Sequence, residues 1–105
     1  MKQLHFQEKY PITVFNIKKS ETRFVSAEQM ADYFERCIEE TPRVSYIATF
    51  DHLAHSREIK GDVSPDILSA FNVVFCFGHS LPNPQVLSVR PRSIGIADMG
   101  EHFVV

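Results

Sequence analysis

The sequence predicts an α+β fold, a small sheet of about four to five strands with one main helix and short helices packed on it. Three observations support this class. Runs rich in β-branched and aromatic residues recur along the chain. One segment, about residues 27–40, carries apolar residues at a helical period. The 105 residues show neither a repeat nor a linker, so we expect a single domain over 1–105.

The N-terminal part predicts a strand followed by a possible return strand. Residues 10–17 (YPITVFNI) are mostly apolar, and Pro11 stands near the start, where a strand tolerates proline. A polar turn over 18–21 follows, and residues 22–25 are expected to form a short hairpin strand.

The main helix is predicted from about Ala27 to Glu40. Ser26 is a favourable N-cap, Gln29 stands where a capping box needs it, and Pro42 ends the helix. One face carries a stripe of five residues, namely Met30, Tyr33, Phe34, Cys37 and Ile38. We expect this stripe to lie on the sheet, held mainly by Phe34 and Ile38.

Residues 44–50 (VSYIATF) alternate, which predicts a strand with Val44, Tyr46, Ala48 and Phe50 on one face. Residues 53–62 are expected to form a loop or a short helical turn, with Asp51 as its N-cap. The other possible partner of Asp51 is a histidine from another segment, such as His79 or His102.

The second half of the chain predicts three further strands and two short helices. Residues 64–66 (SPD) resemble a helix start, and the apolar run 71–78 (FNVVFCFG) predicts a central strand buried on both faces. A short helix from Pro84, capped by Asn83, precedes two last strands over 94–97 and 103–105.

Composition narrows the function classes. The chain is 44% hydrophobic and 23% charged, with a net charge of −2, which is ordinary globular usage. We therefore expect neither nucleic-acid binding nor attachment to a membrane. No apolar run approaches the roughly 20 residues of a membrane-spanning helix, and two cysteines do not make a disulfide framework. These features predict a soluble cytoplasmic protein with reduced, buried cysteines.

The order of landmarks along residues 10–105 resembles a known family. ITVFNI precedes the Ser-led helix SAEQMADYFERCIEE, ATFDHLAH ends a strand in Asp-His, and SPDILSAFNVVFCFG ends a strand in Phe-Gly. PQVLSVRPRSIGIADMGEHFVV then supplies a short helix and a strand pair. This order resembles the bacterial domain-of-unknown-function family numbered 302. The resemblance implies an α+β fold and a tendency to dimerise, and it implies no established activity.

The sequence departs from that family at two places. Gly78 is followed by His79 and Ser80 where the family usually continues with Asn-Pro. Residues 18–24 look like an insertion relative to the family.

Histidines supply the candidate ligand site. His52 stands just past the end of one predicted strand and His79 just past another, and His55 follows His52 by three residues. If these strands are parallel neighbours, both imidazoles lie at the same rim of the sheet. The predicted ligand-binding residues at this rim are Asp51, His52, His55, Phe77, Gly78 and His79.

Several interpretations of this rim stay open. Cys76 and His79 have a C-x-x-H spacing that a metal could use, although a lone pair of this kind is a weak signal. The histidines could instead bind a small molecule, transfer protons, or serve only as surface or structural residues. The sequence identifies no cofactor, no nucleophile motif and no Gly-rich phosphate loop.

Three function classes follow. The first is a dimeric ligand-binding or accessory module, and the second is a small enzyme using histidine acid–base or metal chemistry at the same rim. The third is a purely structural interaction subunit. We expect a homodimer because the terminal strand 103–105 would otherwise leave an apolar sheet edge uncovered.

Overall fold

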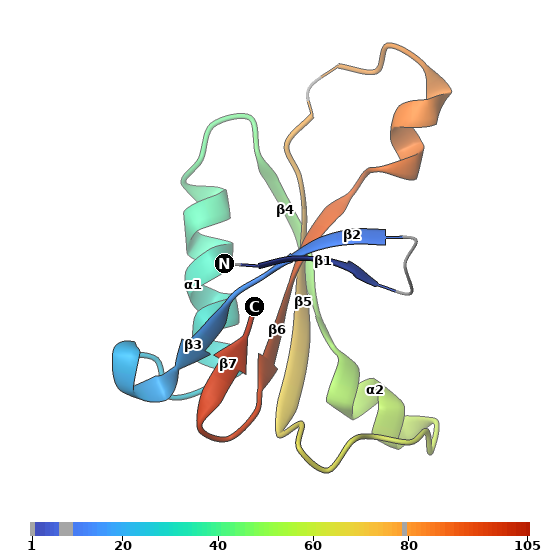
Figure 1. Cartoon of the computed structure of the whole chain (residues 1–105). Coiled ribbons are helices and arrows are strands. Elements are labelled where there is room, and N and C mark those ends of the chain that lie inside the picture. The colour runs from blue at the N-terminus through green and yellow to red at the C-terminus, as the bar shows by residue number, and fades with distance from the viewer. Residues whose placement is uncertain (1, 7–9, 79) are drawn as a thin grey trace.

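A five-stranded antiparallel sheet forms the centre of the molecule, with the strand order β3-β7-β6-β5-β4. The computed structural model describes residues 2–6, 10–78 and 80–105. The strands of this sheet are β3 (Asn16–Lys18), β4 (Ser45–Asp51), β5 (Ser69–Cys76), β6 (Arg92–Asp98) and β7 (His102–Val104). Helix α1 (Ala27–Glu39) lies on one face of the sheet (Figure 1). This arrangement confirms the predicted α+β fold.

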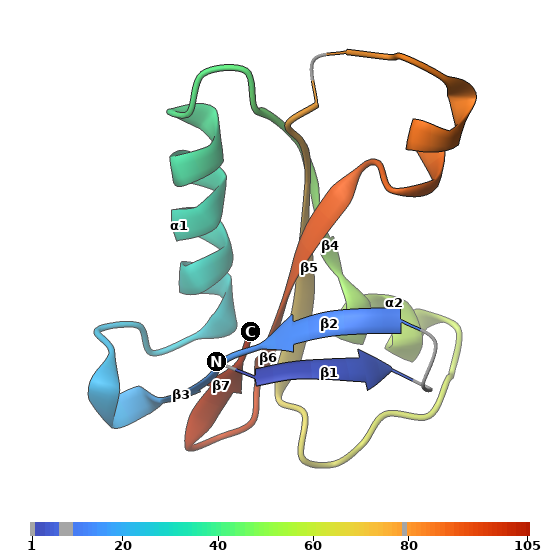
Figure 2. The same cartoon turned by 45° about the horizontal axis from the view of Figure 1, so that its top comes forward.

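Three smaller elements lie on the side of the sheet opposite α1 (Figures 1 and 2). Strands β1 (Lys2–Phe6) and β2 (Tyr10–Val14) form a separate antiparallel hairpin. Helix α2 (His52–Glu58) follows β4 directly, and the 3₁₀ turn η2 (Pro84–Ser88) lies in the long loop between β5 and β6. A second 3₁₀ turn, η1 (Lys19–Glu21), follows β3.

The predicted first strand is in fact two strands in two different sheets. β2 ends at Val14 and β3 begins at Asn16, with Phe15 alone between them. The Phe15 N–H donates to the Val105 carbonyl at 2.9 Å, and Val105 N–H donates back at 2.9 Å. Strand β1 was not predicted, and residues 22–25 lead into α1 without forming the expected return strand.

Local capping fixes the start of α1 as predicted. The Ser26 hydroxyl accepts from the Gln29 N–H at 3.2 Å. The Gln29 side-chain oxygen reaches one residue further back than in a standard capping box and accepts from the Val25 N–H at 2.9 Å. Two backbone donors at the helix start are thus satisfied, which sets the position at which α1 begins.

The core lies between α1 and the sheet. Its buried apolar residues are Ala27, Met30, Ala31, Ile38, Val73, Ile96 and Phe103. Phe34, predicted to hold the helix to the sheet, is only half-buried, whereas the two alanines let the helix approach the strands closely. The predicted stripe is therefore correct in direction, but the most buried residues of the helix are Ala27, Met30 and Ala31.

The last strand is not a sheet edge. β7 pairs with β6 on one side and with β3 on the other, and Phe103 at its centre is fully buried. The edges of the sheet are β3 and β4. The prediction of an uncovered edge at residues 103–105 is therefore wrong, because it did not foresee that an N-terminal strand would pair there.

A bulge in β4 overturns the predicted face assignment. Tyr46 pairs with Phe75, but Ala48 pairs with Val74, so the register shifts between them. Directly paired residues share a face, so Tyr46 lies on the α1 side while Ala48 and Phe50 lie on the other. The alternation that joined Val44, Tyr46, Ala48 and Phe50 on one face breaks at Ile47.

Two further expectations in the second half are wrong. Residues 65–66 form a turn, with the Ser64 hydroxyl accepting from the Asp66 N–H at 3.4 Å, and no helix follows before β5. β5 has only one face covered by α1, so it is not buried on both faces. The predicted short helix is present as the 3₁₀ turn η2, where Asn83 caps Gln85 N–H at 3.1 Å, but Leu87 and Val89 are exposed.

Candidate functional site

The face of the sheet opposite α1 carries small and polar side chains. We call it the open face and define it by Ala70, Asn72, Ser93, Gly95, Ala97 and Val104. Asn72 pairs with Gly95, and Ala97 pairs with both Ala70 and Val104, so these residues share one side. They alternate along the strands with the buried Val73, Ile96 and Phe103.

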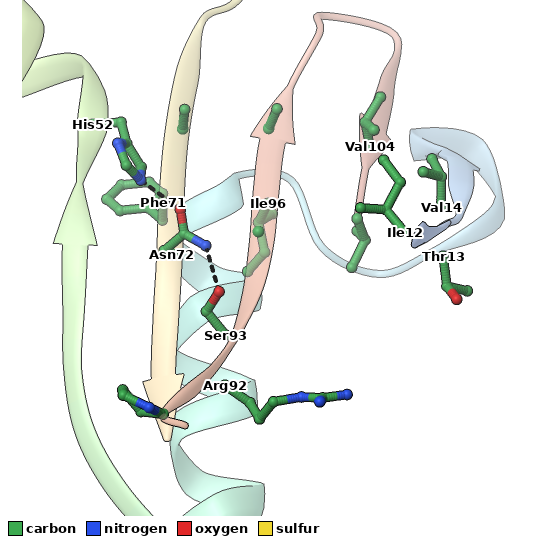
Figure 3. A pocket seen from close by; sticks show the side chains of 15 residues that line it. Ile12, Thr13, Val14, His52, Phe71, Asn72, Arg92, Ser93, Ile96 and Val104 are labelled. Atoms are coloured by element: carbon green, nitrogen blue, oxygen red, sulfur yellow. Dashed lines mark hydrogen bonds between the residues drawn. The ribbon is translucent and has the colours of Figure 1, made fainter. Parts of the chain in front are cut away.

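These small side chains leave a pocket of about 890 Å³ over the open face. Ile12, Thr13 and Val14 of the hairpin form one wall of the pocket, and His52 lies at the opposite wall (Figure 3). Pro91 and Arg92 border the pocket at the start of β6. The pocket therefore brings together residues from both ends of the sequence and from its middle.

A row of three hydrogen-bonded side chains crosses this face. The ring Nε2 of His52 bonds the Asn72 side-chain oxygen, and the Asn72 Nδ2 donates to the Ser93 hydroxyl at 3.1 Å (Figure 3). An amide oxygen can only accept, so the His52 Nε2 carries the hydrogen. The Ser93 hydroxyl accepts from Asn72 and keeps its own hydrogen for a further acceptor.

The end of β4 positions His52. The Asp51 carboxylate accepts from the Ala54 N–H at 2.9 Å and so caps α2, which confirms the predicted role of Asp51 as an N-cap. The Phe50 ring lies edge-on to the His52 ring, with centroids 4.7 Å apart, and 5.2 Å from the His55 ring. The aromatic contact and the cap together hold the imidazole against Asn72.

The predicted rim is divided between the two ends of the sheet. Asp51 pairs with Phe71 at the start of β5, so His52 and His55 lie at that end. Phe77 and Gly78 follow Cys76, which pairs with Ser45 at the opposite end of β4. β4 and β5 are antiparallel neighbours, whereas a common rim for His52 and the residues after β5 would require parallel strands. His79 lies outside the described residues.

Within the described part of the chain, neither the cysteines nor the acidic and histidine side chains gather into a metal site. Cys37 and Cys76 are free thiols and are half-buried, less buried than predicted. A hydrogen bond with Cys37 is the main cause that raises the pKa of the Tyr33 phenol. Among the side chains that the structure describes, those of residues 12–78 and 80–105, no three His, Cys, Asp or Glu come together as a metal site would need.

Sequence reasoning missed Asn72 and Ser93. A signal for Asn72 was present, because it is the one strongly polar residue inside the run FNVVFCF. A polar side chain within such a strand needs partners if it is buried, or marks an uncovered face if it is not. Ser93 carried no comparable signal, because its role depends on the register of β5 against β6.

The row favours binding over nucleophilic catalysis. Asn72 stands between Ser93 and His52 and bonds both of them. A general base has to contact the hydroxyl whose proton it takes, and the Asn72 amide between the two side chains does not relay protons. His52 is therefore not placed to activate Ser93 as a general base. The free hydrogen of Ser93 is instead available to an acceptor atom of a bound molecule.

Comparison with known proteins gives a family without an assigned activity. None of the helices in the described part of the chain is long and apolar enough to cross a membrane. No curated protein and no solved structure matches the sequence. One family model does match the chain, and it describes a different family from the one numbered 302 that the landmarks resemble. The model of a family of unknown function (DUF6858) matches residues 1–105, and the chain therefore belongs to that family.

Proposed function

We propose that the chain is a dimeric module that binds a small molecule in the open-face pocket. The ligand class is an apolar body that carries a carbonyl or carboxylate oxygen. The observation that supports this proposal is the row His52–Asn72–Ser93, which ends in a hydroxyl donor at an otherwise largely apolar pocket. Pockets for small molecules combine apolar walls with a few placed polar groups in this way.

The pocket volume and charge agree with such a ligand. Its volume of about 890 Å³ lies in the roughly 300–1,000 Å³ range of small-molecule sites. Among the described residues that line it, Arg92 and His52 are basic or able to become so, and no side chain is acidic. An acceptor oxygen, neutral or negative, therefore meets no repelling carboxylate side chain there.

The predicted site residues divide into different roles under this proposal. His52 contacts the ligand site directly, while Asp51 and His55 support it through the α2 cap and the Phe50 ring. Phe77 and Gly78 are not among the residues that line the pocket, but the guanidinium of Arg92, which does line it, lies 6.0 Å from the centre of the Phe77 ring. A contribution from His79 remains a prediction.

Three probes with the same ring and different head groups test the proposal. We expect benzoate and benzamide to shift the amide NMR signals of Asn72 and Ser93 in a saturable way. Benzylamine, which offers only a cationic donor, should shift them much less. If benzoate and benzamide both leave the open-face signals unchanged, the proposed ligand class is wrong.

Matched variants assign the effect to the row. Ser93→Ala removes the free donor and should weaken benzoate binding about tenfold, the loss expected for one hydrogen bond to a charged acceptor. Ser88→Ala is the control, because the Ser88 hydroxyl bonds the Gln85 carbonyl in η2 and does not line the pocket. Equal affinity in the two variants would contradict a role for Ser93.

A further inference from the structure

We infer that a second copy of the chain covers the open face, with the β1–β2 hairpin of each copy lying on the sheet of the other. This inference rests on the proposed function for the identity of the pocket and adds the partner that completes it. Three properties of the chain support it, namely its large surface area, its exposed apolar side chains and the weak attachment of its hairpin.

The chain exposes more surface than a folded monomer of its mass. Its accessible surface is 7962 Å², whereas a 12.0 kDa monomer exposes about 6,000 Å². Its radius of gyration is 15.1 Å, against about 13 Å for a compact domain of this length. The excess of roughly 2,000 Å² per chain is of the size that each copy of an obligate homodimer buries.

Much of the exposed apolar surface belongs to the elements on the open-face side. Leu81, Leu87 and Val89 in the loop around η2 are 76%, 65% and 55% exposed. Ile12 of the hairpin is 41% exposed, and Ile59 at the end of α2 is 63% exposed. These elements surround the open face in both views of the molecule (Figures 1 and 2). Apolar side chains gathered around one face are typical of an interaction surface.

The hairpin has little to hold it in place within one chain. In the part of the chain that the structure describes, β1 and β2 pair only with each other. The hairpin joins the five-stranded sheet through Phe15, and an isolated two-stranded hairpin is only marginally stable in water. It therefore needs a surface to rest on beyond the few residues of its own sheet that it approaches.

A second copy fits these requirements better than a different protein. Each chain offers both a projecting arm and an uncovered face, which is the self-complementary arrangement of a two-fold dimer. When each hairpin keeps its place beside its own pocket and also packs on the open face of the partner, each arm and each face is buried at once. This arrangement also closes the open side of the pocket, so that the row His52–Asn72–Ser93 faces an enclosed chamber between the two copies.

The oligomeric state of matched variants tests this interface. Ile12→Glu places a carboxylate in the hairpin, and Val25→Glu places one at a side chain that is 68% exposed just before α1. By sedimentation velocity, we expect the wild-type chain and Val25→Glu to be dimers and Ile12→Glu to be a monomer. A wild-type monomer at all concentrations, or dissociation by Val25→Glu alone, would overturn the inference.

A second measurement covers the case in which Ile12→Glu does not fold. A dimer prepared from one isotope-labelled and one unlabelled copy should give NOEs between the hairpin of one copy and Ala97 or Val104 of the other. A dimer without such contacts uses another face and contradicts the inference.

The benzoate titration separates this inference from the proposed function. A wild-type monomer whose Asn72 signal still responds to benzoate keeps the ligand-binding part of the proposed function and removes the dimer and its interface. A dimer with the expected NOEs and no response to benzoate or benzamide keeps the interface and removes the ligand.

Discussion

The two faces of the five-stranded sheet are built from the same strands and differ in almost every property. The face under α1 holds Val73, Ile96 and Phe103, which are almost completely buried. The open face holds Asn72, Ser93 and Gly95, which offer polar atoms and empty space. Because side chains alternate along a strand, one short sequence can supply stability to one face and a pocket to the other. Substitutions on the two faces should therefore have different consequences.

The largest effect is expected at the centre of the covered face. Phe103→Ala leaves a cavity beneath α1 and should lower the free energy of unfolding by about 3–5 kcal/mol. Its neighbour Val104 points to the open face, and Val104→Ala should cost about 1 kcal/mol. Urea unfolding followed by circular dichroism, at one fixed protein concentration, measures both. Similar losses in the two variants would remove the distinction between the faces.

The next largest effect is expected at a partly buried ion pair at the edge of the covered face. Asp98 is 7% exposed, bonds the Lys19 ammonium at 2.9 Å and accepts from the Gly100 N–H at 2.9 Å. Asp98→Ala leaves both donors without their partner and should cost about 2–3 kcal/mol in the same unfolding measurement. The exposed Asp66 is the control, and Asp66→Ala should change stability by less than about 0.5 kcal/mol.

A smaller effect on stability is expected at the centre of the open face. Asn72→Val removes the link between His52 and Ser93, but water can reach both partners. The free energy of unfolding should change by less than about 1 kcal/mol, while the response of the open face to benzoate is lost. A loss of several kcal/mol would mean that the row is structural, as one interpretation of the sequence allowed.

The smallest effect is expected at Gly95 and has the opposite sign. A Cβ built there meets only the Asn72 Nδ2 at 3.7 Å, an ordinary contact. Gly95→Ala should therefore raise stability by about 0.5 kcal/mol, because it restricts the unfolded chain. Gly100→Ala is the contrasting control and should destabilise, because Gly100 has a φ of +98°. Destabilisation by Gly95→Ala would show that the open face is packed more tightly than its contacts indicate.

Features that depend on neighbouring residues in the sequence could be predicted. The start of α1 and the start of α2 follow from Ser26 and Asp51, whose side chains cap N–H groups three residues later. The two last strands follow from short apolar runs on either side of a turn at Met99 and Gly100.

Features that depend on pairing between distant segments could not be predicted. The bulge at Ile47 moves Ala48 and Phe50 to the other face, and alternation alone gives no sign of it. Ser93 reaches Asn72 only through the register of β5 against β6, and the antiparallel order of β4 and β5 separates His52 from Phe77. The candidate site is therefore largely a product of topology, although one of its residues, His52, was identified from the sequence.

The pairing of β3 with β7 has a consequence for the order of folding. These strands come from opposite ends of the sequence, so their contact closes nearly the longest loop the chain can form. The units α1, β4–β5 and β5–β6 involve shorter separations and can assemble before it. The hairpin, tied to β3 through Phe15, then reaches its place only after β3 has docked. Until that step the open face stands without its hairpin wall, so we expect the open-face pocket to be the last part of the molecule to form.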